Sequence, residues 1–333
     1  MKNIGLIVFS LFQLYGVAQE SKKINGVSFV ASREEVVQEH VAEVVRLNAN
    51  HAAIMPFGFI KEISSPEIIF NTERQWFGET AKGAEQYIAL LHSNGIKTMV
   101  KPQIWIWKGE FTGTLKMSSE ANWKALEESY EDFILTYARL AETAGSELFC
   151  IGTELEQFVM MRPDFWKSLI AKVRKVYSGK LTYAANWDEY PNVPFWEDLD
   201  YIGIDAYFPL SEERTPTVAL LKAGWQDHKE KIKSLYSTCS TPVLFTEFGY
   251  RSMDQNAWKP WLVDRHEEPV NLISQANATQ AILEEFWTED WFAGGYVWKW
   301  FVDHKKSGGE KDNRFTPQNK PAEKVLREFY KKY

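Results

Sequence analysis

The chain has 333 residues, of which 45% are hydrophobic and 25% are charged, and its formal net charge is -7 at neutral pH. This composition is typical of a globular protein, and the length is compatible with one large barrel or two ordinary domains. Acidic and basic residues are mixed along the chain without a basic stripe, so the sequence predicts no nucleic-acid partner.

The first 18 residues have the pattern of a secretory signal peptide. Lys2 provides a positive start, residues 4–14 are largely apolar, and Gly16 and Ala18 place small residues at a cleavage site. Cleavage near Ala18 predicts a mature, secreted or periplasmic protein that consists of residues 19–333. No later stretch has the roughly 18 apolar residues that a membrane span requires, so no membrane insertion of the mature form is predicted.

Strands and helices are predicted to alternate along the mature chain. The predicted strands are residues 26–31, 51–57, 97–105, 147–152, 181–186, 201–206, 243–246 and 295–300. The predicted helices are residues 32–48, 80–93, 122–143, 164–176, 218–236 and 276–286, with a closing helix from Ala322. Ser32 and Glu35 are spaced as a capping box for the first helix. Gly95 and Gly145 lie just beyond two helices, where glycine commonly ends a helix.

Eight strands separated by helices, with no linker rich in Pro, Gly or Ser, favour a single α/β domain of the (β/α)8 TIM-barrel type over two doubly wound domains. The segment 187–199 after the fifth strand is short for a regular helix and is predicted to form only a turn or so. Three longer segments follow strands and are predicted to be extended loops on the C-terminal face, where they wall a cleft. These segments are residues 61–77, 108–119 and 253–271.

The cysteines and histidines give no indication of a metal or cofactor. Cys150 and Cys239 are the two cysteines of the sequence, and two free thiols are favoured over a bridge. The chain contains no CxxC or HxH spacing, and its six histidines are scattered. The sequence therefore predicts neither a zinc site nor a two-metal hydrolase site.

Two glutamates lie at the ends of short apolar runs, Glu154 in LFCIGTE and Glu247 in PVLFTEFGY. By strand count Glu154 ends the fourth strand and Glu247 the seventh, and catalytic side chains of a (β/α)8 barrel come from such strand ends. A carboxylate directly after an apolar run is costly to bury unless it is paired or functional. When two carboxyl groups face one cleft, one can act as an acid and the other as a base or nucleophile, and together they can cleave a glycosidic bond. Asp205 and Glu156 are the rival carboxylates.

Other side chains near strand ends are candidate substrate contacts. Tyr207 ends the sixth strand, where its hydroxyl either donates to Glu247 or packs in the core. Trp298 and Trp300 alternate along the eighth strand and are predicted to point the same way, as a floor for a sugar ring or as core filling. The remaining candidates are Asn186 and Trp187 at the end of the fifth strand, and Lys101, Gln103 and Trp105 on one face of the third.

The segments LFCIGTE, DYIGIDAYFP, PVLFTEFGY and GGYVWKWF resemble retaining glycosidases that carry glutamates on strands four and seven. Within that clan the chain is most similar to glycoside hydrolase family 113, whose characterised activity is on β-1,4-mannans. The resemblance implies Glu154 as general acid/base and Glu247 as nucleophile, with a polysaccharide or oligosaccharide substrate. Many members of the clan have Asn immediately before the acid/base, whereas this chain has Thr153, so the contact with the substrate 2-hydroxyl departs from the common pattern.

Three interpretations of the function remain open. The leading one is a secreted retaining β-glycosidase, in particular an endo-acting β-1,4-mannanase, with a β-glucan or β-mannoside substrate as the near alternative. The second is a non-catalytic carbohydrate-binding barrel that keeps an aromatic cleft. The third is a metal-dependent hydrolase on the same barrel, which the lack of HxH spacing disfavours. No oligomeric state is predicted.

Overall fold

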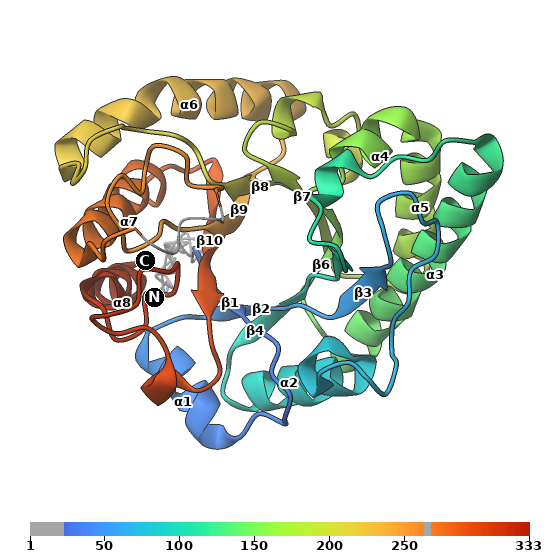
Figure 1. Cartoon of the computed structure of the whole chain (residues 1–333), viewed down its shortest axis with the longest axis horizontal. Helices are drawn as coiled ribbons and strands as arrows, with labels where there is room; N and C mark the ends of the chain where they lie inside the picture. The colour runs from blue at the N-terminus through green and yellow to red at the C-terminus, as the bar shows by residue number, and fades with distance from the viewer. Residues whose placement is uncertain (1–22, 263–267) are drawn as a thin grey trace, which may run out of the picture.

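The computed structural model describes residues 23–262 and 268–333 (Figure 1). Within these residues, eight parallel strands close into a barrel in the order β1-β10-β9-β8-β7-β6-β4-β2. The strands are β1 (Ile24–Phe29), β2 (His51–Ile54), β4 (Lys97–Val100), β6 (Leu148–Thr153), β7 (Lys180–Asn186), β8 (Tyr201–Ala206), β9 (Val243–Phe248) and β10 (Phe292–Trp300). The predicted single (β/α)8 barrel is confirmed.

Helices cover the outside of the barrel (Figure 1). They are α1 (Gln38–Arg46), α2 (Ala81–Ser93), α3 (Glu120–Ala144), α4 (Glu156–Met161), α5 (Pro163–Val176), α6 (Val218–Cys239), α7 (Leu272–Phe286) and α8 (Pro321–Lys332). The short α4 adds to the predicted elements. The segment after β7 contains only the 3-10 turns η3 (Tyr190–Asn192) and η4 (Trp196–Asp198), as predicted for residues 187–199.

Capping residues in the sequence set several helix ends. Ser119 caps α3 by accepting a hydrogen bond from the N–H of Asn122, and Thr80 and Asn271 cap α2 and α7 in the same way. Gly145 ends α3 at a φ of 72°, a left-handed conformation that glycine adopts without a steric penalty. Helix ends with such residues therefore lie close to their predicted positions, except that α7 begins four residues earlier.

The first helix is shorter than predicted. It begins at Gln38 rather than residue 32, and Ser32 does not cap it. The Ser32 hydroxyl instead bonds to the hydroxyl of Tyr87 (2.7 Å) and donates to the carbonyl oxygen of Glu34 (2.7 Å). This contact with α2 engages the side chain that the capping box requires, so a long-range partner overrides the local pattern.

Two predicted strands are each divided by a proline. Residues 51–57 and 97–105 were each expected as one strand, but β2 ends before Pro56 and β4 ends before Pro102. The chain continues as β3 (Phe57–Ile60) and β5 (Gln103–Ile106), which pair in parallel as a separate two-stranded sheet. Proline has no N–H to donate to a strand ladder, so the barrel strands end where the prolines occur.

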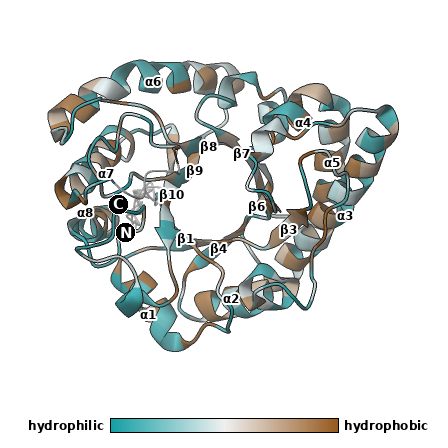
Figure 2. Ribbon diagram, in the orientation of Figure 1, coloured by the Kyte–Doolittle hydropathy of each residue, from teal (hydrophilic) through white to brown (hydrophobic). Residues whose placement is uncertain are grey.

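The hydrophobic core lies between the strands and the surrounding helices, and a smaller cluster fills the barrel interior. Figure 2 shows that the helices carry both hydrophobic and hydrophilic residues, as expected of helices that pack on a barrel and face water. Tyr296 and Met99 are among the residues inside the barrel. Cys150 lies there too, and both it and Cys239 are free thiols, as predicted.

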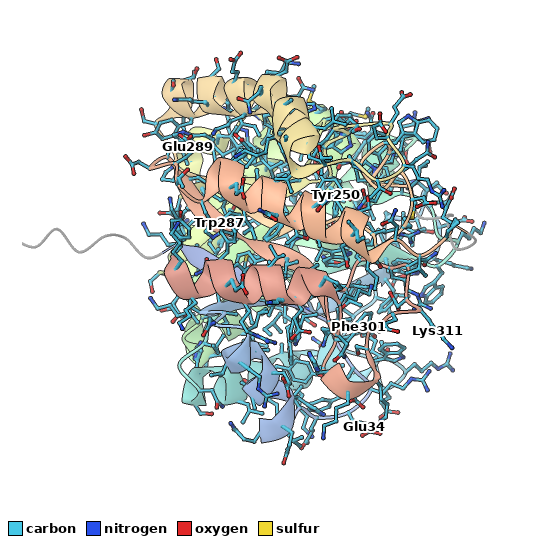
Figure 3. All side chains as sticks on the ribbon, turned by 90° about the vertical axis from the view of Figure 1, so that its left-hand side faces the viewer. Glu34, Tyr250, Trp287, Glu289, Phe301 and Lys311 are labelled. Atoms are coloured by element: carbon cyan, nitrogen blue, oxygen red, sulfur yellow. The ribbon has the colours of Figure 1, made fainter. Side chains whose placement is uncertain are left out.

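The two ends of the barrel carry different segments. In the side view of Figure 3, Tyr250, two residues after β9, and Phe301, directly after β10, lie at one end together with Lys311. Trp287 and Glu289, which precede β10, lie at the other end. The segments that follow the strands therefore gather at one face, where active sites of (β/α)8 barrels are built.

The structure describes only part of what the sequence predicts. The expected export signal, residues 1–18, lies outside the described residues. Within the described ranges, no helix combines the length and apolar character needed to cross a membrane. Across those same ranges, no group of three or more His, Cys, Asp or Glu side chains is arranged to hold a metal ion.

We predict that Trp287→Ala lowers the free energy of unfolding by about 3–5 kcal/mol, because it removes a large side chain from the core. The Trp287 ring is fully buried, packs against Phe248 and Phe292, and donates its indole N–H to Asn25 (2.8 Å). Chemical denaturation followed by circular dichroism measures the change. The control is Trp107→Ala, because Trp107 is 55% exposed. Equal destabilisation by the two substitutions would contradict this account of the core.

Candidate active site

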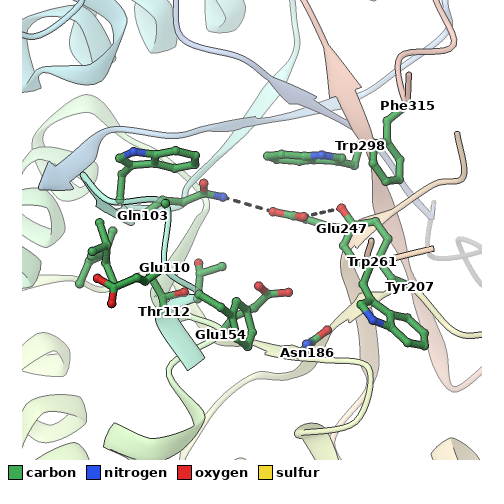
Figure 4. A pocket seen from close by; sticks show the side chains of 16 residues that line it. Gln103, Glu110, Thr112, Glu154, Asn186, Tyr207, Glu247, Trp261, Trp298 and Phe315 are labelled. Atoms are coloured by element: carbon green, nitrogen blue, oxygen red, sulfur yellow. Dashed lines mark hydrogen bonds between the residues drawn. The ribbon is translucent and has the colours of Figure 1, made fainter. Parts of the chain in front are cut away.

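A cavity of about 580 Å³ lies where the barrel strands end (Figure 4). Seven of the predicted candidate residues line it, namely Gln103, Trp105, Glu154, Asn186, Tyr207, Glu247 and Trp298. Three others, Lys101, Trp187 and Trp300, do not line it. The remaining lining residues are Ile104, Ile106, Gly109, Glu110, Phe111, Thr112, Thr153, Trp261 and Phe315. The two glutamates that the sequence pairs are thus brought to one cavity.

Glu154 directly follows β6 and reaches into the cavity (Figure 4). Burial raises its pKa well above the ordinary value, and the negative charges of Asp205 and Glu247 raise it further. These effects outweigh the opposing effect of the Lys101 ammonium. Glu154 therefore keeps its proton to a higher pH than an exposed glutamate does, which suits a proton donor.

Glu247 is the penultimate residue of β9 and is surrounded by hydrogen-bond donors. Lys101 donates to its Oε1 at 2.5 Å, and the side-chain amide of Gln103 donates to the same oxygen at 3.2 Å. The Tyr207 hydroxyl donates to the other oxygen at 2.6 Å (Figure 4). Donors on both oxygens are complementary to a negatively charged carboxylate and fix its orientation. The contact that the sequence suggested between Tyr207 and Glu247 is present.

Lys101 is a buried ion-pair partner rather than a residue of the cavity wall. Its side chain has no exposed surface, and its ammonium lies 3.3 Å from Asp205 and 2.5 Å from Glu247. Burial alone would lower the pKa of Lys101, but the two carboxylates outweigh burial and hold it above the ordinary value. The expectation that Lys101 shares one face with Gln103 and Trp105 is wrong, because Pro102 separates the lysine from β5.

The rival carboxylates lie outside the cavity lining. Asp205 is fully buried in β8, where it accepts a hydrogen bond from the Thr246 hydroxyl (2.7 Å) as well as contacting Lys101. Burial, followed by the charge of Glu247, raises the pKa of Asp205 to about 7. Glu156 is in the first turn of α4 and does not line the cavity. The placement therefore favours Glu154 and Glu247 as the reacting pair.

Trp298 and Trp300 do not point the same way, so this expectation is wrong. Val27 of β1 pairs with Val297, whereas Phe29 pairs with Trp300, so β10 contains one extra residue between these pairs. Such a bulge reverses the alternation of side chains along a strand. Trp298 consequently lines the cavity, while Trp300 is completely buried in the core.

Of the other aromatic and polar candidates, some line the cavity and others contact the residues that line it. Trp105 lines the cavity and is more than half exposed. Trp187 does not line it but stacks on Trp261, with ring centroids 4.8 Å apart, and Trp261 does line it. The side-chain oxygen of Asn186 accepts a hydrogen bond from the Trp187 N–H (2.8 Å), which fixes its amide at the cavity edge.

Two of the three long segments predicted as cleft walls supply lining residues: segment 108–119 supplies residues 109–112, and segment 253–271 supplies Trp261. Segment 61–77 supplies none, but its Ile63 N–H donates to the side chain of Glu110 (3.2 Å). Phe315 was not predicted, because it lies in the segment between β10 and α8 and no sequence motif around it indicates a site.

Thr153 also lines the cavity, and its buried hydroxyl has no hydrogen-bond partner within the described residues.

The model of Glycoside Hydrolase Family 113 matches residues 30–320. A solved family 113 β-mannanase from Alicyclobacillus acidocaldarius is 24% identical, with a TM-score of 0.82 over 93% of this chain and 97% of that chain. A family 113 β-1,4-mannanase solved as a complex is also 24% identical, with a TM-score of 0.81 over 94% of this chain and 100% of that chain. A β-glucuronidase from Faecalibacterium prausnitzii is 15% identical, with a TM-score of 0.58 over 88% and 45% of the two chains. No curated protein matches the chain.

We predict that Lys101→Met destabilises the protein by about 3–5 kcal/mol at pH 8, because it leaves two buried carboxylates without their shared cation. The loss is smaller at pH 5. The pKa of Asp205 is raised to about 7 in the folded protein, above its unfolded value of about 4, so protonation stabilises the fold at low pH and this contribution disappears as the pH rises to 7. Urea denaturation at the two pH values measures the difference.

The matched control is Lys108→Met, which removes a lysine from an exposed ion pair with Glu62. Solvent screens that pair, so its loss changes stability little at either pH. Lys101→Met with the same small effect as Lys108→Met would show that the buried ammonium does not support the two carboxylates.

Proposed function

The chain belongs to glycoside hydrolase family 113, and from this membership we propose that it hydrolyses β-1,4-linked mannan by double displacement. Glu154 is the general acid/base and Glu247 is the nucleophile. The observation that carries the proposal is the unequal environment of two carboxyl groups on one cavity: the pKa of Glu154 is raised, whereas Glu247 receives three hydrogen bonds from donors. Environments that differ in this way assign opposite roles to two acids.

In the first step, a carboxylate oxygen of Glu247 attacks the anomeric carbon while the glycosidic bond breaks. Glu154 gives its proton to the departing oxygen, so the leaving sugar departs as a neutral alcohol and Glu154 becomes a carboxylate. Tyr207 and Gln103 donate to the Glu247 oxygens and hold them in place for the attack. The product of the step is a glycosyl ester of Glu247.

In the second step, Glu154 acts as a base. It removes a proton from water, the water oxygen attacks the anomeric carbon, and the bond to Glu247 breaks, so both glutamates return to their starting states. Esterification neutralises the charge of Glu247 that raises the pKa of Glu154 in the free enzyme. The pKa of Glu154 therefore falls in the intermediate, which favours the carboxylate form that a base requires.

The cavity suits a neutral oligosaccharide chain. Trp298 and Phe315 lie on one side of it, and Glu110 and Thr112 lie on the other, with Glu154 between (Figure 4). The flat faces of Trp298, Trp105 and Trp261 provide stacking surfaces for sugar rings. Thr153, the residue before Glu154, also lines the cavity. The similar solved structures, described as a β-1,4-mannanase and a β-mannanase, support mannan as the polymer.

The substrate assignment is tested by comparing hydrolysis of mannan, glucomannan, cellulose and xylan oligosaccharides. Proton NMR during the reaction identifies the anomer that is formed first. We expect the highest kcat/KM with mannan oligosaccharides and an initial product with retained β configuration. Preference for cellulose or xylan oligosaccharides would contradict the substrate, and an initial α product would contradict double displacement.

We predict that Glu154→Ala lowers kcat/KM for mannan oligosaccharides by about 10²–10⁴-fold, the usual contribution of a general acid. The wild-type enzyme loses activity as rising pH deprotonates Glu154, at a pH well above the pKa of an ordinary glutamate. Glu154→Ala loses this decline of activity at alkaline pH. With an aryl glycoside, whose leaving group needs no proton, added azide restores turnover of Glu154→Ala by displacing Glu247 from the glycosyl ester and giving a β-glycosyl azide. The control is Glu156→Ala, which removes a carboxylate two residues away that does not line the cavity. If the activity of Glu154→Ala fell at alkaline pH as that of the wild type does, the assignment of Glu154 as the general acid would be contradicted.

A further inference from the structure

The backbone at Glu154 has a conformation that residues with a side chain rarely adopt. Its φ angle is 49°, in the left-handed region. This conformation costs about 1–2 kcal/mol for a residue with a Cβ, so it persists only where surrounding contacts hold it. Glu154 lies where β6 turns toward α4, and a change in this dihedral angle would redirect the carboxyl group relative to the cavity.

Two backbone N–H groups hold this turn in place. The Glu154 N–H donates to the carbonyl oxygen of Ala184 on β7 (2.8 Å). The next N–H, that of Leu155, donates to the hydroxyl oxygen of Tyr183 (2.7 Å). The first bond joins two neighbouring strands, but the second depends on a side chain. Tyr183 therefore anchors the peptide group on the C-terminal side of Glu154.

The Tyr183 ring has little freedom to move. It is fully buried and packs edge-on against Trp166 and Phe195, with centroid distances of 5.5 Å and 5.7 Å. Gly152 allows the ring to approach β6, because a Cβ at this glycine would lie 3.0 Å from the Tyr183 ring. The hydroxyl that holds the Leu155 N–H is therefore fixed by its ring.

Glu189, in the segment after β7, accepts hydrogen bonds from Tyr183 and from the backbone beside the cavity. The Tyr183 hydroxyl donates to Glu189 Oε1 (2.6 Å), and Glu189 Oε2 accepts the N–H of Asn186 (3.0 Å). Glu189 is only 2% exposed, and burial raises its pKa to about 7 although both hydrogen bonds lower it. One buried carboxyl group thus supports two cavity residues, Asn186 directly and Glu154 through Tyr183.

We propose that Tyr183 and Glu189 are positioning residues that hold the Glu154 carboxyl group and the Asn186 amide in the reacting geometry. This inference rests on the proposed function, because it assumes that Glu154 protonates the leaving oxygen. Packing alone does not require these polar groups, since apolar side chains would fill the same space without the desolvation of a hydroxyl and a carboxyl. Their hydrogen bonds run to backbone N–H groups at or beside cavity residues, as expected of supports for a catalytic side chain.

The test compares Tyr183→Phe with wild type on two substrates that differ in their need for a proton. A mannan oligosaccharide has a sugar alcohol as leaving group and needs protonation, whereas 2,4-dinitrophenyl β-mannobioside releases a stable phenolate and does not. We expect kcat/KM to fall about 10–100-fold for the oligosaccharide and less than about 3-fold for the aryl glycoside. The ratio of the two values does not depend on the fraction of folded enzyme.

The matched control is Tyr177→Phe, because the buried Tyr177 hydroxyl donates to the Ser146 carbonyl oxygen (2.8 Å) at the start of β6, away from the cavity. We expect Tyr177→Phe to leave the ratio of the two kcat/KM values unchanged. The same fall on both substrates in Tyr183→Phe, or no fall on either, would overturn the inference. A wild-type enzyme that hydrolyses neither substrate would instead overturn the proposed function.

Glu189→Gln gives a second readout. The charge of Glu189 is one of those that raise the pKa of Glu154, so its removal moves the alkaline limb of kcat/KM for the oligosaccharide to lower pH. As in Tyr183→Phe, kcat/KM falls more for the oligosaccharide than for the aryl glycoside. A pH profile and a ratio both equal to those of wild type would show that Glu189 does not act on Glu154.

Discussion

An ammonium group buried between two carboxylates is the interaction on which the rest of the site depends. Lys101 has no exposed surface and contacts Glu247 at 2.5 Å and Asp205 at 3.3 Å. Without such a partner, a carboxylate below the cavity would take up a proton. Burial and the negative charge of Glu247 raise the pKa of Asp205 to about 7, although the Lys101 ammonium opposes them. Glu247 accepts hydrogen bonds from two further donors, Gln103 and Tyr207. These donors favour a negatively charged carboxylate, which is the form that acts as a nucleophile.

The barrel brings this arrangement together from distant parts of the chain, and much of that was predictable. The ends of parallel strands meet at one face, so the positions of Glu154 and Glu247 after apolar runs already indicate a shared cleft. The alternation of strands and helices is a local signal repeated along the whole chain, which makes the fold class robust to errors at single elements. Tyr207 was predictable for the same reason, because it directly follows β8.

The remaining features depend on contacts or distortions that no short pattern contains. The bulge in β10 places Trp300 in the core, and the alternation of apolar residues in GGYVWKW gives no sign of it. The segment with Glu189 has the composition of a turn, and its partner Tyr183 appears in the sequence as one more core aromatic. Lys101 lies among residues that resemble a continuous strand, and its two partners are more than 100 residues away in the chain. Pairings over such distances are visible only in the folded protein.

We propose Glu247 as the nucleophile. The most direct measurement is mass spectrometry of the enzyme after reaction with 2-deoxy-2-fluoro-β-mannosyl fluoride, which forms the glycosyl ester readily but releases it slowly. We expect a single covalent adduct that maps to the peptide containing Glu247 and is absent from Glu247→Gln. An adduct on Glu154 or Asp205, or no adduct on an enzyme that hydrolyses mannan, would contradict it.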